Sequence, residues 1–371
     1  MEKHSTPQYY FITNIYKNHL LITSEASARI CLFGDHQDYL NLPVIAGTID
    51  RKIKIKATPN STTTYFLQLL DLEENITINL NNKNTLISSG DYYRSSMEVL
   101  QKKGAQFMQG YDIEISGTIP INAGISSSSA LVVAWLRFLI QVQEVVRPVS
   151  KVTLGELAYA AEVLYFKQPG GLMDQYTIAQ GGLLYINTKT GSTSELPNTL
   201  GKLVVAESGI YKETLTVLQN ARTFAQNALE VVLKKEPNFD IHTATVNSYN
   251  NYLQFVPEKY KDHWYAAIHN HLLTQEAKKA LQTDKPNLKA IGTLMNEHQK
   301  ILEERIQNTP IIMKTQMDAA LSAGAFGAKI IGSGGGGCMV AMVSEDTLQP
   351  VINAFLAKGA KAAYEVNLTK S

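Results

Sequence analysis

The stretch between residues 120 and 135 places a glycine and four serines directly before an apolar, helix-forming segment. It reads Pro120-Ile-Asn-Ala-Gly-Ile-Ser-Ser-Ser-Ser-Ala-Leu-Val-Val-Ala-Trp135. Serine side chains can cap such a helix, because its first-turn N–H groups have no partner within the helix. These N–H groups and the helix dipole together form an anion site, most naturally for phosphate. The stretch lacks the GxxxxGK[ST] pattern of a Walker A loop, and an ordinary serine-capped helix is the simplest alternative.

A second stretch places acidic and imidazole side chains in a turn that follows a strand. Arg29-Ile-Cys-Leu-Phe-Gly34 reads as the strand, and Asp35, His36 and Asp38 lie in the turn. Carboxylates accept hydrogen bonds from sugar hydroxyls and a neutral imidazole can donate or accept, so the cluster suits a polyol. The alternative is a solvated turn whose side chains cap backbone groups. Arg29 is costly in an apolar strand unless it is paired or faces a polar cleft, which makes it a candidate site residue.

Two further carboxylates lie in the same half of the chain, Glu162 on a predicted helix and Asp174 in the segment Gly170-Gly-Leu-Met-Asp-Gln-Tyr176. Phosphoryl transfer to a hydroxyl requires a divalent ion on the phosphates and a group that orients or deprotonates the acceptor. One carboxylate for each task would meet that need. The alternatives are a solvated helix face for Glu162 and a turn cap for Asp174.

The third unusual stretch, Gly332-Ser-Gly-Gly-Gly-Gly-Cys338, contains four consecutive glycines between two apolar strands. Each glycine costs backbone entropy, so the run indicates a place where the backbone must approach another group closely. A flexible linker is the alternative, and the tightly flanking apolar strands disfavour it.

Alternation and helical periodicity predict an α+β protein. Strands are expected over residues 9–12, 29–34, 52–57, 65–70, 75–80, 111–116, 182–187, 203–206, 328–331, 338–343 and 363–368. Helices are expected over residues 92–103, from the serine run to about 145, 153–166, 212–234, much of the stretch to 323, and 347–358. The turn-rich piece 188–201 predicts a boundary between domains 1–200 and 201–371.

Composition describes a globular protein with a core of its own. The 371 residues suffice for two domains that share a cleft, and 44% are hydrophobic and 18% charged. The net charge of +1 does not favour a nucleic acid or an acidic membrane surface as partner. Cys31 and Cys338 lie far apart, which suggests a reducing compartment without a disulfide framework. With no signal-peptide pattern and no apolar run near ~18 residues, we expect a cytoplasmic protein.

Taken in their order along the chain, these stretches resemble the motifs of the GHMP small-molecule kinases (galacto-, homoserine, mevalonate and phosphomevalonate kinases). Residues 120–130 resemble the family's PxxxGLSSSA phosphate loop, and residues 332–338 its late glycine-rich motif. Residues 28–39 are similar to the galactokinase signature GRVNLIGEHTDY, and residues 170–176 to its GIMDQF segment. Met295-Asn-Glu-His298 occupies the place of the family's MxxSH-like helix.

The resemblance implies an N-terminal ribosomal-S5-domain-2-like domain and a C-terminal ferredoxin-like domain, with ATP and acceptor between them. It implies that Asp174 is the base or orienter of the acceptor hydroxyl and that Arg29 stabilises the alkoxide or the transferring group. Ser128 and Glu162 would hold Mg²⁺. The loop at Ala123, Gly124, Ile125, Ser126, Ser127, Ser128 and Ser129 would bind the ATP phosphates. Sugar contacts are expected from Asp35, His36, Asp38, Gly171 and Gly335.

Departures from the family pattern leave the substrate open. Asp35 replaces a Glu, and Ser129 replaces an Ala, so Ser127, Ser128 and Ser129 are all candidates for the metal hydroxyl. The SxYNxRR run of galactokinases is absent, and Lys212 and Thr214 resemble the mevalonate-kinase arrangement.

Three functions therefore compete. The first is an ATP- and Mg²⁺-dependent kinase for C1 of galactose or a related sugar, acting as a monomer or homodimer. The second is a mevalonate-type alcohol kinase of the same fold. The third is a non-catalytic, galactokinase-like sensor of sugar and ATP.

Overall fold

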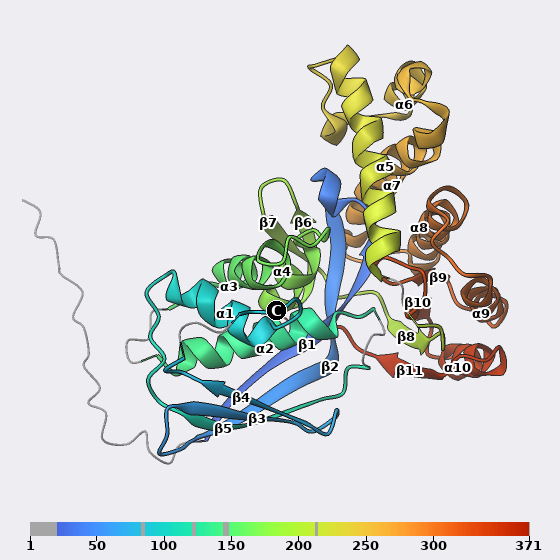
Figure 1. Cartoon of the computed structure of the whole chain (residues 1–371). Coiled ribbons are helices and arrows are strands. Elements are labelled where there is room, and N and C mark those ends of the chain that lie inside the picture. Colours follow the sequence, from blue (N-terminus) through green and yellow to red (C-terminus); the bar gives the residue numbers. More distant parts are fainter. Residues whose placement is uncertain (1–20, 83–85, 121–123, 144–147, 212–213, 371) are drawn as a thin grey trace, which may run out of the picture.

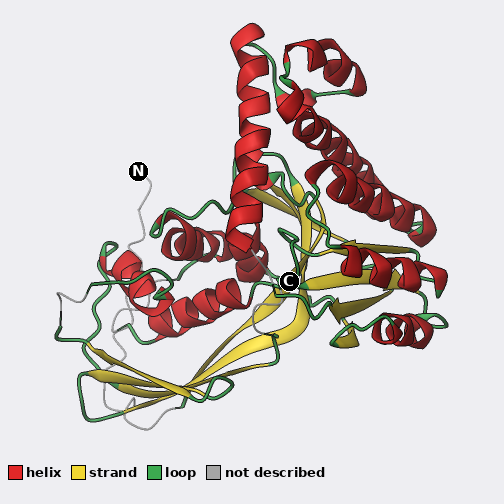
Figure 2. Ribbon diagram, turned by 45° about the vertical axis from the view of Figure 1, so that its right-hand side comes forward, coloured by secondary structure: helices red, strands yellow, loops and turns green. Residues whose placement is uncertain are grey.

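The computed structural model describes residues 21–82, 86–120, 124–143, 148–211 and 214–370. It contains two β-sheets with helices packed beside them (Figure 1). In Figure 2 the strands run from the lower left through the middle of the molecule to the right, and the helices lie mainly above them and to their right.

The first sheet has seven strands in the order β4-β3-β5-β2-β6-β7, with β1 paired to β2. The β3–β5 pair is parallel and the other pairs are antiparallel. The strands are β1 (Ile22–Phe33), β2 (Val44–Pro59), β3 (Thr64–Leu69), β4 (Glu74–Asn79), β5 (Tyr111–Gly117), β6 (Leu183–Asn187) and β7 (Ser192–Leu196).

The helices of the N-terminal half gather on one side of this sheet (Figure 1). They are α1 (Tyr92–Gln101), α2 (Ser127–Gln141), α3 (Lys151–Tyr159) and α4 (Met173–Gln180), and a π-helical turn at Ala160–Leu164 continues α3. The central helix α2 is apolar on most of its surface, and its Trp135 and Phe138 side chains are fully buried. A helix that is apolar nearly all round requires neighbours on every side, and this explains the position of α2 between the sheet and the other helices.

The second sheet has the antiparallel order β11-β8-β10-β9. Its strands are β8 (Lys202–Glu207), β9 (Gly327–Ile330), β10 (Cys338–Val343) and β11 (Ala362–Val366). The helices of this half are α5 (Thr214–Lys235), α6 (Val246–Tyr252), α7 (Lys261–Leu281), α8 (Leu288–Ile301), α9 (Ile311–Ser322) and α10 (Leu348–Ala357).

Strand β10 is buried on both faces, and this accounts for its continuously apolar sequence Cys338-Met-Val-Ala-Met-Val343. In β10, Val340 and Met342 belong to a core shared with the first sheet, whereas Met339 and Ala341 pack in the core beneath α9 and α10. This alternation is the period-two pattern of a strand. Because the shared core runs through both halves, the two sheets pack as one body.

The sequence predicted most elements to within a few residues, but β1 and β2 begin about seven residues earlier than the strands predicted at 29–34 and 52–57. The piece at 188–201, for which the sequence predicts a turn-rich boundary and no strand, contains β7, which pairs with β6. Its polar sequence Ser192-Thr-Ser-Glu-Leu196 lies at a sheet edge, where a strand needs few apolar residues. The helix expected at 153–166 changes to π-helical geometry at Ala160. The strand expected at 9–12 lies outside the described residues.

A buried ion pair joins the two halves. The Lys329 Nζ of β9 lies 2.6 Å from Asp35 Oδ2, and both side chains are fully buried. The same Nζ donates to the carbonyl oxygens of Cys31 and Ile330. The other carboxylate oxygen, Asp35 Oδ1, accepts from the Gly332 N–H at 2.8 Å. Burial, the largest single influence, opposes ionisation of Asp35. The Lys329 charge, together with His298 and the hydrogen bonds to the carboxylate, more than offsets burial and holds the pKa of Asp35 below its usual value.

This pair generates a prediction about stability. Lys329→Met leaves the Asp35 carboxylate buried without its cation, which should lower the unfolding free energy by about 3–5 kcal/mol. Lys314→Met, which removes a surface cation paired with Glu303, should cost at most about 1 kcal/mol. Urea unfolding of both variants measures the difference. Equal effects would contradict a role for the buried pair in joining the halves.

Candidate active site

Arg29 lies on strand β1, and its guanidinium hydrogen bonds with the Asp174 carboxylate at the centre of the site. Arg29 Nε lies 2.7 Å from Asp174 Oδ1, and Nη2 lies 2.9 Å from Oδ2. The third guanidinium nitrogen, Nη1, donates to the Gly124 carbonyl oxygen at 2.9 Å. Burial alone would lower the pKa of Arg29, but the Asp174 carboxylate more than offsets this and raises it. The sequence predicted that this strand cation is either paired or faces a polar cleft, and Arg29 does both.

The serine-rich loop contacts the same carboxylate. Ser126 has left-handed backbone geometry (φ 61°) and occupies the N-cap position of α2. The sequence suggested that the serines cap the helix. The Ser126 hydroxyl instead donates to Asp174 Oδ2 and makes no capping hydrogen bond. Ser127 begins α2, and Ile125 is fully buried. Ala123 lies outside the described residues.

Glu162 is buried in the π-helical turn, which excludes the solvated helix face as its setting. Its Oε2 accepts from Gln175 Nε2 at 2.8 Å, and it also hydrogen bonds with Ser128 and Ser129. Burial raises the pKa of Glu162, and these hydrogen bonds partly oppose the rise. A carboxylate and serine hydroxyls are hard oxygen donors, so this group fits Mg²⁺ with further oxygens from a bound phosphate. Among the described residues, no group of three or more His, Cys, Asp or Glu could hold a metal ion.

His36 connects the turn after β1 to the glycine-rich segment. Its Nε2 lies 3.0 Å from the Ser333 carbonyl oxygen, and its Nδ1 lies 3.2 Å from the Tyr39 hydroxyl. Asn308 Nδ2 donates to the same Ser333 oxygen at 3.0 Å. The expectation of close backbone approach at the glycines is confirmed, because a Cβ on Gly334 would lie 2.4 Å from the Asn308 carbonyl oxygen.

Asp38 and Gly171 form the second wall of the site. A Cβ on Gly171 would lie 2.0 Å from Asp38 Oδ2, so only glycine lets the carboxylate lie there. The Asp38 carboxylate accepts from the N–H groups of Tyr39 and Met173. Burial and, secondarily, the Asp174 charge raise the pKa of Asp38 to about 6.

These groups surround one cavity of about 320 Å³. Of the predicted site residues, its walls include Arg29, Asp35, His36, Asp38, Ser128, Ser129, Glu162, Gly171 and Asp174. Gly124, Ile125, Ser126, Ser127 and Gly335 are outside its lining, and the Gly335 N–H donates to the Asn308 carbonyl oxygen. Asp35 lines the cavity although both of its oxygens bind Lys329 or the Gly332 N–H.

Several residues of the site were not predicted from the sequence. Tyr92, Gln168, Met173, Gln175, Leu218 and Ser333 line the cavity, and Lys329 and Asn308 hold its walls. Lys329 offered a usable signal, since it is a cation inside an apolar strand, as Arg29 is. Met173, Gln175 and Ser333 lie inside segments that the sequence singles out, although they were not predicted as site residues. Tyr92, Gln168, Leu218 and Asn308 are neutral residues in ordinary contexts, and only the tertiary structure brings them to the site.

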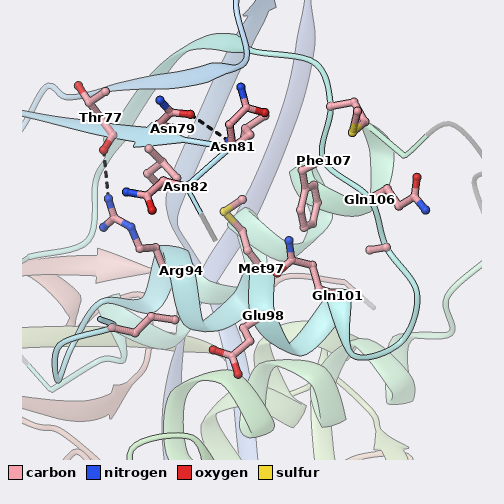
Figure 3. A pocket seen from close by; sticks show the side chains of 15 residues that line it. Thr77, Asn79, Asn81, Asn82, Arg94, Met97, Glu98, Gln101, Gln106 and Phe107 are labelled. Carbon is pink, nitrogen blue, oxygen red and sulfur yellow. Dashed lines mark hydrogen bonds between the residues drawn. The ribbon is translucent and has the colours of Figure 1, made fainter. Parts of the chain in front are cut away.

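A second cavity of about 850 Å³ lies between β4 and α1 (Figure 3). Met97 and Phe107 contribute apolar surface, and the amides of Asn79, Asn81 and Gln101 contribute donors and acceptors. Arg94 Nη2 donates to the Thr77 carbonyl oxygen at 3.1 Å. Helix α1 adjoins both cavities, because Tyr92 in its first turn lines the first.

Comparison with known proteins identifies the class. The fold is the two-domain GHMP kinase fold, with a cavity where the turn after β1, the serine-rich loop and the glycine-rich segment meet. Residues 91–182 match the GHMP kinases N terminal domain, and residues 277–361 match the GHMP kinases C terminal domain. The chain belongs to the GHMP kinase family.

Relatives of two kinds are equally similar. A galactokinase of Thermococcus kodakarensis is 25% identical over 85% of this chain and 87% of its own length. A mevalonate kinase of Thermococcus sibiricus is 25% identical over 87% of this chain and 90% of its own length.

Solved structures with this fold include both kinds as well. Galactokinase of Lactococcus lactis, crystallised with galactose, has a TM-score of 0.82 at 21% identity and covers 94% of this chain and 93% of its own. Mevalonate kinase of Methanococcus jannaschii has a TM-score of 0.69 at 18% identity and covers 96% and 100%. Within the part of the chain that the structure describes, no helix has the length and apolar character to cross a membrane.

The raised pKa of Asp38 predicts how stability depends on pH. A carboxyl that is harder to ionise when folded favours the folded state at low pH, and this contribution is lost as pH rises from about 4 to about 6. Asp38→Asn keeps an oxygen acceptor and removes the charge. Relative to the wild type, the unfolding free energy of the variant should therefore rise by about 2–3 kcal/mol between pH 4 and pH 7. Unfolding free energies across this range measure the gain, and a difference that does not change with pH would contradict it.

Proposed function

We propose that the protein is an ATP- and Mg²⁺-dependent kinase that phosphorylates a monosaccharide hydroxyl, at C1 of galactose or a related sugar. The observation that carries the proposal is that Asp174, Asp38 and His36 line one cavity. Two hydrogen bonds from the Arg29 guanidinium hold the Asp174 carboxylate there. An oriented carboxylate beside polyol-binding groups is what transfer to a sugar hydroxyl requires.

In this proposal Asp174 orients the acceptor hydroxyl and accepts its proton. Arg29 holds both carboxylate oxygens in a fixed plane, so Asp174 has one orientation before the acceptor arrives. The positive charge of Arg29 lies beside the reacting oxygen, where negative charge develops. Ser126 adds a third contact that keeps Asp174 against the loop.

The charges of the cavity favour an uncharged acceptor. Asp38, Glu162 and Asp174 line it, whereas Arg29 is the one Lys or Arg among its described lining residues. Arg29 is already paired with Asp174, so a carboxylate on the acceptor would meet repulsion without a free cation. Hydroxyl groups instead match the carboxylate acceptors and the imidazole of His36.

The phosphate donor would approach the other side of the cavity. The N–H groups at the start of α2 and residues 124–129 suit its phosphates, and Ser128 and Glu162 would hold Mg²⁺. Bound there, the ion would neutralise phosphate charge. The cavity between β4 and α1 offers apolar surface and amides for the base, and α1 connects it to the acceptor cavity.

The alternative is a kinase for a non-sugar alcohol such as mevalonate. The observation that favours it is the equal identity of this chain to galactokinases and mevalonate kinases. The paired state of Asp35 also favours it, because this carboxylate has no oxygen free of protein contacts for a sugar.

A substrate panel tests the proposal. ADP release with Mg-ATP should appear with galactose or another neutral sugar among glucose, N-acetylgalactosamine, fucose and arabinose. Glucuronate and mevalonate should be poor acceptors because each carries a carboxylate. Turnover with mevalonate and none with the sugars would establish the alternative. No turnover with any acceptor, while ATP still binds, would indicate the non-catalytic sensor.

Asp174→Asn is expected to abolish acceptor phosphorylation while leaving ATP affinity nearly unchanged. The amide keeps the shape but cannot take the proton or pair with Arg29, which should lower kcat by ~10²–10⁴. Steady-state kinetics and ATP titration measure the two quantities. A comparable loss of ATP affinity would mean that Asp174 serves the nucleotide and not the acceptor.

A further inference from the structure

One face of helix α5 touches both acceptor-binding segments of the N-terminal half. Leu218, Arg222 and Gln226 are spaced by four residues, so they lie along a single side of the helix. Leu218 lines the acceptor cavity. Figure 1 shows α5 extending away from the region between the two sheets, with its N-terminal end nearest to them.

Arg222 holds the segment that leads to Asp174. Its Nη1 donates to the Pro169 carbonyl oxygen at 2.7 Å. Pro169, Gly170 and Gly171 line the cavity just before α4 begins, and Gly171 is the residue on which Asp38 packs. A hydrogen bond from a charged guanidinium is stronger than one between neutral groups, so this contact restrains the segment.

Gln226 holds the segment that carries His36 and Asp38. Its Nε2 donates to the Tyr39 carbonyl oxygen at 3.2 Å. The Gln226 Oε1 accepts from Arg222 Nε at 3.4 Å. The arginine therefore orients the amide, and the two side chains act as one unit on the same helix face.

We propose that Arg222 and Gln226 are positioning residues that hold the 36–39 turn and the 168–171 segment at the correct separation for the acceptor. Neither residue touches the acceptor; both act through Tyr39 and Pro169. Since Asp38 and Gly171 meet across this gap, a small separation of the segments would weaken acceptor binding and spare the phosphate loop. The role in acceptor binding rests on the proposed kinase function, whereas the restraint on the two segments does not.

Hydrogen–deuterium exchange tests the restraint without any acceptor. In Arg222→Met, amides of residues 37–42 and 168–176 should exchange about tenfold faster, while those of β2 and β5 are unchanged. Arg222→Lys retains a donor for Pro169 but loses the contact that orients Gln226. It should therefore restore slow exchange at 168–176 and leave 37–42 fast.

The matched control is Lys234→Met, which removes one cation from the exposed end of the same helix. Its exchange in both segments should equal that of the wild type. If Arg222→Met exchanges like this control, or if β2 and β5 also exchange faster, the restraint is overturned.

A kinetic measurement with galactose as the probe tests the consequence for the acceptor. Arg222→Met should raise the acceptor KM about tenfold, change kcat by no more than about twofold, and leave the ATP KM unchanged. Faster exchange without a change in acceptor KM would overturn the role in acceptor binding. If the wild type does not phosphorylate galactose, the proposed acceptor fails and the exchange measurements still decide the restraint.

Discussion

The site depends on the pairing of one buried guanidinium with one carboxylate. Arg29 is only 3% exposed, and a charge buried to that extent must be compensated. Asp174 provides the compensation through two hydrogen bonds, and the Gly124 carbonyl oxygen takes a third donor of the same group. The pairing therefore requires β1, the serine-rich loop and α4 to meet at one point. The position of the helices on this side of the sheet follows from that requirement together with the apolar surface of α2.

A second buried cation requires a carboxylate partner where the two halves of the chain meet. Lys329 is fully buried, and its charge is met by Asp35 and by two carbonyl oxygens. Both side chains are buried, so loss of either partner would leave the other charge buried without its counter-charge. Asp35 therefore has a structural role in holding the two halves together, although it begins the polar turn that faces the cavity. A shorter side chain than Glu suits this use, because the carboxylate stays near its own backbone and the glycine-rich segment.

Much of the site could be predicted because several of its residues are of types that are unusual in their local sequence. A cation in an apolar strand, a carboxylate after a double glycine and four consecutive glycines each violate a local preference, and each lies at the site or supports it. Most of the predicted elements within the described residues matched in type because their periodicity is strong, although only the second part of β1 and of β2 was predicted. The edge strand β7 was missed because its polar residues carry no periodic apolar signal. Asn308 and Arg222 could not be predicted, because their roles arise from tertiary contacts between segments that are distant in the sequence.

The two halves of the chain contribute to the cavity in different ways. The N-terminal half supplies the charged groups that line the cavity, from β1, the turn after it, the π-helical turn and α4. The C-terminal half supplies mainly backbone and neutral surface, through Gly332, Ser333 and Leu218. A change in the position of the C-terminal half would therefore alter the shape of the cavity more than its charge. For that reason the hydrogen bonds between the halves, at His36 and Ser333 as well as at Arg222 and Pro169, help to set the shape of the cavity, and under the proposed function they would influence which acceptor fits.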